Sequence, residues 1–402
     1  MTQITEQALS EEGGSILGGA LLVAGTSIGG GMLALPVLTS LGGYVPSLFI
    51  YFICWVFMCS TGLLLLELSL TFGEGANIVT MADKTLGRPG KIAAWVLYLF
   101  MFYSLTIAYM VGCGNLISYM FDGHIPDTLS PILFTLLFAP FIWAGAKVVG
   151  PINSVMMLVL GVLYFSFIGL GYPHLNWELL AHKEWSLSLI ALPIAFVSFA
   201  YQGIVPTLAS YMKHDGRKAR LALIIGSFIP FITYAIWQGM ILGIVPVEGA
   251  YGLKETLSKG ENAVWPLKHF IQNPAVWVIG QYFAFFALLT SFFGVTLGLM
   301  DFLADGLKME KCKKGRFILS LLVFIPPLII ATLHPHVFLM ALDVAGGYGS
   351  ALLLGLLPIL MVWKKRFYQK DLTNIQIPIK KWGLIVLILF IIFEVTLETL
   401  RV

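Results

Sequence analysis

Residues 25–36 read Gly25-Thr-Ser-Ile-Gly-Gly-Gly-Met-Leu-Ala-Leu-Pro36 and lie in the middle of the first apolar segment. Three consecutive glycines weaken a helix, and a bilayer offers no water to satisfy the backbone groups that a loosened helix exposes. Such a break is tolerated where the freed N–H and C=O groups line a cavity and bind a guest. The segment therefore predicts a membrane helix interrupted at a binding site for a small charged molecule.

Close helix packing is the alternative explanation of these glycines. Gly25 and Gly29 form a small-xxx-small pattern, which often marks only a contact face between membrane helices. The sixth apolar segment, however, carries a matching interruption, Ser198-Phe-Ala-Tyr-Gln-Gly-Ile-Val-Pro206. Its proline removes a helix donor and its glycine permits a bend. Two interrupted helices favour a substrate site over packing alone.

The composition predicts an all-α polytopic membrane protein. Apolar residues make up 58% of the 402 and charged residues 11%, and the mean hydropathy is +0.89. A soluble domain carries about a quarter charged residues. The first 15 residues contain glutamates but no Lys or Arg, unlike a secretory signal, so we expect the first span to be retained.

Apolar runs along the chain predict eleven transmembrane helices. We place them at 16–39, 43–72, 91–120, 130–145, 150–171, 188–211, 221–245, 275–305, 317–333, 336–363 and 382–400. Nineteen of the 24 Lys and Arg residues fall in one alternate set of loops. By the positive-inside rule the N-terminus is then cytoplasmic, and an odd span count puts the C-terminus in the periplasm.

The two interrupted helices each open a set of five spans, which is the sequence pattern of an inverted-repeat transporter. The expected parts are a cytoplasmic tail (1–15), a first repeat (16–172), a second repeat (188–364) and an eleventh helix (382–400). The stretch 250–272 is too polar to span and is expected to form an external helix or lid.

Three segments resemble the hydroxy and aromatic amino acid permeases. They are Gly25–Pro36, then Glu67-Leu-Ser-Leu with Ala82-Asp-Lys-Thr-Leu-Gly87, and Asp343-Val-Ala-Gly-Gly-Tyr-Gly349. Within that family the chain is most similar to tyrosine-specific permeases of chlamydia-like bacteria. The resemblance implies the leucine-transporter fold, with five-plus-five inverted repeats and one extra helix. It also implies an amino acid bound between helices one and six, and co-transport of a proton or sodium.

The resemblance further implies roles for residues outside the first helix. Thr290 and Ser291 match a hydroxyl pair that binds Na⁺ in sodium-coupled relatives, where Ala24 would add a carbonyl. Tyr103 falls where those relatives contact the substrate carboxylate, and Phe196 falls where they place an aromatic lid.

Tyr211 and Asp305 fall where sodium-coupled relatives build a cytoplasmic gate. That gate also uses an N-terminal arginine, and this chain has no Lys or Arg before Lys84. Its inner gate must therefore close differently or be weaker.

An amino acid zwitterion brings a carboxylate and an ammonium into a low-dielectric site, and both must be paired. Backbone N–H groups at the start of a half-helix suit the carboxylate, and loosened carbonyls suit the ammonium. We expect this site at Thr26, Ser27, Ile28, Gly29, Gly30 and Gly31, with carbonyls near Ala24, Gly25 and Ser198.

The side-chain pocket is expected to come from spans three and six. Its candidates are Tyr103, Phe196, Phe199, Tyr201 and Gln202. An aromatic substrate would stack on the rings, and Gln202 or Tyr103 could bind a phenolic hydroxyl. Packing between helices is an equally good account of Phe199, whereas a buried idle amide would be costly at Gln202.

Glu67 and Asp343 are the intramembrane carboxylates predicted to couple transport to an ion. An ionised carboxylate within an apolar helix pairs, coordinates an ion or takes a proton. The alternatives are a structural hydrogen bond to the first helix for Glu67 and a gate position for Asp343. Glu394 and Glu398 lie near the outer end of a peripheral span and are given no role.

The leading hypothesis is a secondary active importer of an aromatic amino acid, tyrosine first and tryptophan next, in the bacterial inner membrane, driven by proton symport. A sodium-coupled symporter is the main alternative. A channel would need a continuous polar pore, and the spans lack ordered polar faces. An intramembrane enzyme would need a catalytic constellation at membrane depth, and the sequence shows none. No Gly-x-x-x-x-Gly-Lys-[Ser/Thr] occurs, so ATP is not expected to drive transport, and we expect no cofactor, resident metal or nucleic-acid partner.

The basic-residue asymmetry makes the topology testable. A single cysteine placed at position 401 should react with a membrane-impermeant reagent added outside spheroplasts, because the C-terminus is predicted to be periplasmic. Labelling only after lysis would contradict the eleven-span topology.

Overall fold

The computed structural model describes residues 14–73, 75–121, 124–310 and 312–401, and within these ranges all regular structure is helical. The prediction of an all-α protein is confirmed. The expected N-terminal tail (1–15) lies almost wholly outside the described residues.

Long helices alternate with short helical pieces along the chain. The first half contains α2 (Ile16–Ser27), α3 (Gly31–Thr39), η1 (Ser40–Gly42), α4 (Tyr44–Phe72), α5 (Ile78–Leu86), α6 (Arg88–Met120), α7 (Ser130–Ala144) and α8 (Ala146–Gly171). Four short pieces come next, η2 (Tyr172–His174), η3 (Leu179–Ala181), α9 (Trp185–Ser188) and η4 (Leu189–Ala191). They are followed by α10 (Leu192–Ser198), η5 (Gln202–Ile204), α11 (Val205–Tyr211) and α12 (Gly216–Ile244).

The remaining elements continue this pattern. They are α13 (Leu253–Ser258), α14 (Leu267–Phe270), α15 (Pro274–Gly306), α16 (Lys313–Leu333), α17 (Phe338–Val344), η6 (Ala345–Leu356), α18 (Leu357–Trp363), η7 (Lys364–Tyr368) and α19 (Lys381–Arg401). The stretch 250–272 forms the short α13 and α14, as expected of a polar segment that does not span.

Nine helices in the described ranges are long and apolar enough to cross a membrane, and a bent pair, Ile16–Ser27 with Gly31–Gly42, makes ten. The two halves of that pair meet at 58°. α7, at the expected fourth span, is a shorter apolar helix of 15 residues. The protein is therefore polytopic, and the count of eleven spans stays a prediction.

The second break separates α10 from α11. α10 ends at Ser198, and the chain resumes helical geometry at Gln202. Pro206 lies in the first turn of α11, where a missing N–H costs no intrahelical hydrogen bond. Proline thus restarts this helix and does not merely kink it.

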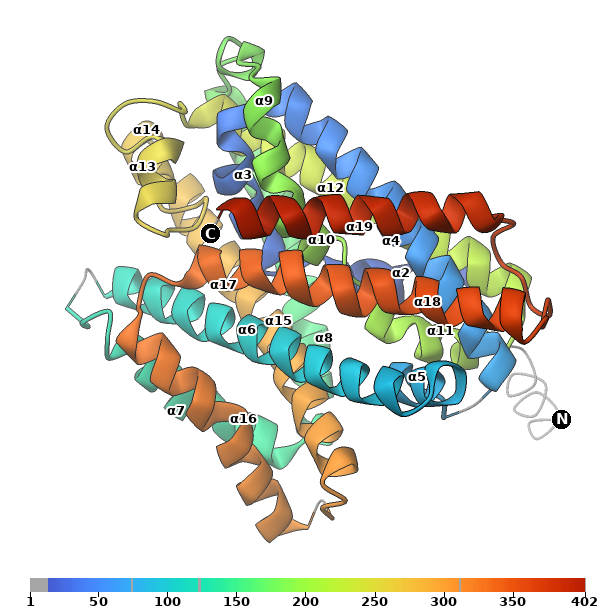
Figure 1. Cartoon of the computed structure of the whole chain (residues 1–402). Helices are drawn as coiled ribbons and strands as arrows, with labels where there is room; N and C mark the ends of the chain where they lie inside the picture. The colour runs from blue at the N-terminus through green and yellow to red at the C-terminus, as the bar shows by residue number, and fades with distance from the viewer. Residues whose placement is uncertain (1–13, 74, 122–123, 311, 402) are drawn as a thin grey trace, which may run out of the picture.

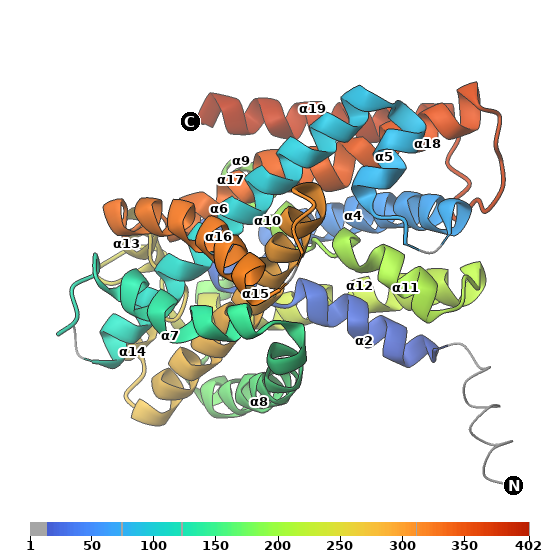
Figure 2. The ribbon, with the colours of Figure 1, turned by 90° about the horizontal axis from the view of Figure 1, so that it is seen from below.

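The loops gather at two opposite ends of the molecule. α5, α11 and the α18–α19 connection lie at one end, and α13 and α14 lie at the other (Figures 1 and 2). At the first end the Asn374 side chain donates to the Leu70 carbonyl at 3.2 Å, and the Gly14 N–H donates to the backbone carbonyl of Tyr211 at 2.8 Å.

α17, η6, α18 and η7 follow one another without a break from Phe338 to Tyr368, with π-helical geometry over Ala345–Leu356. α19 runs beside this rod (Figure 1). π-helical segments are rare and occur frequently at functional sites.

Candidate functional site

The two helix breaks are joined by one side chain, Tyr234 of α12. Its hydroxyl lies 2.7 Å from the Ser27 carbonyl and 2.9 Å from the Ser198 carbonyl. These carbonyls end α2 and α10, where a helix leaves its last C=O groups without an intrahelical partner. A hydroxyl carries one hydrogen, so the two carbonyls share it. Tyr234, which sequence reasoning missed, thus holds the two breaks side by side.

Each glycine of the first break faces a different helix at close range. A Cβ on Gly29 would lie 2.1 Å from Ser291 Oγ of α15, and a Cβ on Gly30 would lie 2.5 Å from the Tyr109 ring of α6. A Cβ on Gly31 would lie 2.5 Å from Ser198 Oγ of α10. All three are therefore closed to larger residues, and the break lies where α6, α10 and α15 converge.

Tyr109, and not Tyr103, is the α6 tyrosine at this break. The Tyr103 hydroxyl donates to the Leu322 carbonyl of α16 at 2.8 Å, and the side chain is half-exposed. Six residues turn a helix through about 600°, so the two tyrosines occupy different faces. The sequence offered no signal to choose between them, because both stand in the same apolar helix.

Phe196 of α10 and Phe199, directly after that helix, have different neighbours. The Phe199 ring meets the Tyr234 ring edge-on at 5.2 Å between centroids, which places it at the break. Phe196 packs against Phe57 of α4 at 5.0 Å and Phe390 of α19 at 5.8 Å. Phe196 therefore links α10 to the peripheral helix, while Phe199 lines the junction.

Tyr201 and Gln202 bind α4. The Tyr201 hydroxyl and Gln202 Nε2 both donate to the Met58 carbonyl at 3.2 Å, and Nε2 also donates to Thr61 Oγ1 at 3.1 Å. Gln202 Oε1 accepts from the Tyr201 N–H at 3.0 Å. The buried amide is thus engaged by protein groups, which resolves the cost of burying it.

Among the remaining residues of the break, Ser27 stands apart. Its Oγ is buried, with no hydrogen-bond partner among the described residues. Thr26 is exposed and donates back to the Leu22 carbonyl at 2.8 Å, and Ile28 is half-buried with its N–H on the Ala24 carbonyl. A buried polar group without a protein partner can be satisfied by a bound molecule, so Ser27 is a candidate for binding the substrate.

Ser291 lies on the α15 face that approaches the break, and Thr290 precedes it in the chain. Gly30 N–H donates to Ser291 Oγ at 3.2 Å, and Ser291 Oγ in turn donates to the Ala287 carbonyl at 2.9 Å. Thr290 Oγ1 donates to the Phe286 carbonyl at 2.9 Å. Within the described ranges no group of three or more His, Cys, Asp or Glu side chains is placed to hold a metal ion.

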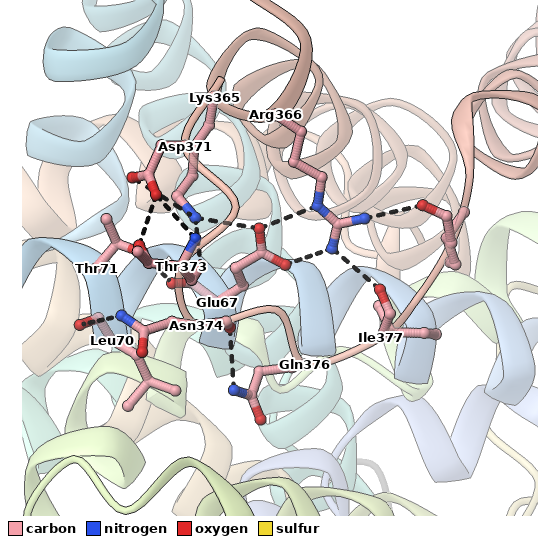
Figure 3. A network of polar contacts seen from close by, with 11 residues as sticks. Glu67, Leu70, Thr71, Lys365, Arg366, Asp371, Thr373, Asn374, Gln376 and Ile377 are labelled. Atoms are coloured by element: carbon pink, nitrogen blue, oxygen red, sulfur yellow. Dashed lines mark hydrogen bonds and ion pairs between the residues drawn. The ribbon is translucent and has the colours of Figure 1, made fainter. Parts of the chain in front are cut away.

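Glu67 is fully buried and held by two cations (Figure 3). Arg366 donates to both of its carboxylate oxygens, through Nε at 3.0 Å and through a second guanidinium nitrogen. Lys365 Nζ lies 3.3 Å from Oε1. Neither predicted role includes these partners, which lie 298 and 299 residues away in the sequence.

The connection between η7 and α19 completes this network. Arg366 donates to the Ile377 and Ile379 carbonyls at 3.0 and 2.9 Å, and Lys365 donates to the Thr373 carbonyl at 2.7 Å. Asp371 lies 3.8 Å from Lys365, and hydrogen bonds from Thr373 lower the pKa of its carboxyl. Two carboxylates thus balance two cations, as burial requires.

The predicted gate residues lie on separate elements. Tyr211 packs on the start of α2, where a Cβ on Gly14 or Gly18 would lie 2.2 or 2.5 Å from it. Asp305 is exposed near the end of α15, beside Gly306, which packs against Trp95 of α6. Asp343 is buried at the end of α17 and borders a cavity of about 310 Å³.

The tryptophan/tyrosine permease family model matches residues 12–398. This chain belongs to the tryptophan/tyrosine permease family. It is 33% identical to tyrosine-specific transport system 1 of Haemophilus influenzae, over 91% of each chain. It is 31% identical to the tryptophan-specific transport protein of that organism, over 84% of this chain and 85% of the relative. The resemblance to aromatic amino acid permeases is confirmed, and the protein is a transporter, not an enzyme.

Solved structures confirm the leucine-transporter fold. The crystal structure of MhsT in complex with L-phenylalanine matches with a TM-score of 0.66 at 17% identity, over 96% of this chain and all of that one. A manganese transporter of Eremococcus coleocola matches with a TM-score of 0.60 at 15% identity, over 96% of this chain and 86% of that one.

The packing of the first break predicts a sharp effect of substitution. Gly30→Leu should abolish uptake by this permease, because its side chain would displace the Tyr109 ring and occupy the junction. Gly161→Leu is the matched control, since a Cβ there meets nothing within 4 Å. Uptake of labelled amino acid by equally expressed variants measures the difference. Normal transport by Gly30→Leu would show that the break serves packing alone.

The buried ion pairs predict a stability effect at Glu67. Glu67→Gln leaves Arg366 and Lys365 buried without their carboxylate, which should cost about 3–5 kcal/mol. Thermal unfolding of purified protein measures it, with Asp83→Asn as the control at an exposed ion pair, expected to cost at most about 1 kcal/mol. Unchanged melting together with lost pH-gradient coupling would assign Glu67 to ion coupling instead.

Proposed function

We propose that this permease imports tyrosine, with tryptophan as its second substrate, by proton symport across the bacterial inner membrane. The observation that supports this most is the junction of two broken helices, where the Tyr234 hydroxyl bridges the Ser27 and Ser198 carbonyls. The names of the relatives, which are tyrosine- and tryptophan-specific, support the aromatic substrate.

The junction suits a zwitterion without any charged side chain. The Ser27 and Ser198 carbonyls converge on one hydroxyl, so an ammonium could take the place that Tyr234 now occupies. The carboxylate would bind N–H groups at the start of α3, where the helix dipole favours negative charge. Ser27 Oγ would add a hydrogen bond at the same place.

The aromatic part of the substrate would meet the rings of Phe199 and Tyr109. Both are buried next to the breaks, and aromatic pairs gain about 0.5–1.5 kcal/mol beyond area burial. Gln202 and Tyr103, the sequence candidates for the phenolic hydroxyl, donate to protein carbonyls in this structure. Either one would have to release that carbonyl to bind a phenol.

Sodium symport is the second candidate, favoured by one observation. The Ser291 hydroxyl bonds to Gly30 at the first break, so its oxygen, together with that of the adjacent Thr290, could bind a hard cation there. Hydroxyls and carbonyls cannot bind a titrating proton near neutral pH, so the two couplings need different residues.

The proposed orientation places the end with α5, α11 and the α18–α19 connection in the cytoplasm. Most Lys and Arg residues lie in the loops of this set. The N-terminus would then be cytoplasmic and the C-terminus periplasmic.

Transport assays in proteoliposomes test substrate and coupling together. Labelled tyrosine, tryptophan and phenylalanine are offered under an imposed pH gradient or sodium gradient, each alone. We expect accumulation of tyrosine above the others, driven by the pH gradient. The double variant Thr290→Ala/Ser291→Ala should retain most of that uptake. Accumulation driven by sodium at constant pH, and lost in the double variant, would replace proton symport with sodium symport.

A further inference from the structure

The peripheral helix α19 buries two glutamates. Glu394 is 0% and Glu398 2% exposed, although most of this helix faces outward. They continue the stripe of Leu384 and Ile391 that packs against the bundle. The sequence analysis gave these two glutamates no role, and their burial is visible only in the structure.

Within the described part of the chain, no cation is paired with Glu394. Both of its carboxylate oxygens are buried without a hydrogen-bond partner among the described residues. The charged groups that act on it are Glu398 of its own helix and Asp343 of α17, and Cys54 faces it from α4. All are acidic, which is the opposite of the arrangement around Glu67.

Among the described residues, the segments of η6, α10 and α18 that pack against α19 leave room for these carboxylates and carry no cation beside them. A Cβ on Gly347 of η6 would lie 2.9 Å from Glu398 Cγ and 3.3 Å from Glu394 Oε1. Tyr348 of η6 points its hydroxyl to Thr399 Oγ1 at 3.2 Å. The α10 and α18 segments that also touch α19 contain no titratable side chain. An ionised carboxylate buried without a partner costs several kcal/mol, so the proton is the ligand that this site takes.

A cavity lies beside Asp343, at the end of the molecule that carries α13. It measures about 310 Å³, and Asp343 borders it together with Lys259, Gly260 and His336. Glu261 lies nearby, and burial raises the pKa of its carboxyl. Asp343 thus stands between the outer cavity and Glu394.

The carboxylates also lie behind one of the broken helices. A Cβ on Gly346 of η6 would lie 1.8 Å from the Pro193 carbonyl of α10, and Phe390 of α19 packs on Phe196. α10 ends at Ser198, whose carbonyl Tyr234 binds. A change in charge between η6 and α19 can therefore reach the junction through direct packing.

We propose that Glu394, with Glu398 and Asp343, forms a buried proton-binding site between α19 and the α17–η6 rod, and that it takes the coupling proton from the outer cavity. In each binding step a hydronium ion gives a proton to a carboxylate, leaving water and a neutral carboxylic acid. The assignment rests on the proposed proton symport and moves the coupling group from Glu67 to α19.

The test uses the full-length protein in proteoliposomes. Three quantities are measured: exchange of labelled tyrosine without a pH gradient, accumulation under a pH gradient, and proton entry reported by a trapped pH dye. Glu394→Gln mimics the neutral acid, so exchange should persist within about twofold, while accumulation and proton entry should fall at least about tenfold. Glu178→Gln, at an exposed loop carboxylate, should match the unmodified protein in all three.

The outcomes separate this site from the proposed function. Glu394→Gln that accumulates tyrosine and admits protons normally overturns the site. If that variant does not fold, infrared spectra of the unmodified protein at neutral pH decide, since the absence of a protonated-carboxyl band overturns the site. Absence of pH-driven accumulation in the unmodified protein, with the band present and lost in Glu394→Gln, overturns proton symport and leaves a proton-binding site in α19.

Discussion

The shared hydrogen bond of Tyr234 is the interaction on which this architecture depends. Two helices that stop inside a bilayer expose carbonyls that water cannot reach, and each unsatisfied group would cost several kcal/mol. The hydroxyl of Tyr234 donates to the carbonyls at both helix ends, those of Ser27 and Ser198. A single hydrogen shared by two acceptors satisfies each incompletely, and a substrate ammonium with three donors would serve them better.

Polar groups within the helical bundle fall into two kinds. Glu67 is paired with Arg366 and Lys365, and these two cations also donate to carbonyls of the loop between η7 and α19. Glu394 and Ser27 are buried without such partners among the described residues. Side chains of the first kind hold elements together, and those of the second kind are available to bind ligands. Whether a buried polar group has partners therefore distinguishes structural from ligand-binding residues better than its depth in the membrane does.

The sequence predicted the two breaks because glycine runs and a mid-span proline are local signals, and hydropathy alone predicted a polytopic helical protein. The partners of the breaks were not predictable in this way. Tyr109 and Tyr103 look alike in one apolar helix, and only the neighbour across the interface decides which borders Gly30. Likewise the partners of Glu67 could not be identified from the sequence, because Arg366 is 299 residues away along the chain.

The distance along the chain between Glu67 and Arg366, 299 residues, bears on how the protein is made. At about 5–20 residues per second a ribosome needs roughly 15–60 s to synthesise that stretch. Throughout this interval α4 is in or near the membrane with a carboxylate whose partners do not yet exist. Until then the Glu67 carboxylate must be in contact with water or with other protein groups, or it must be protonated. The ion pair can form only after the segment Phe338–Tyr368 has been synthesised and packed, so it forms late in assembly.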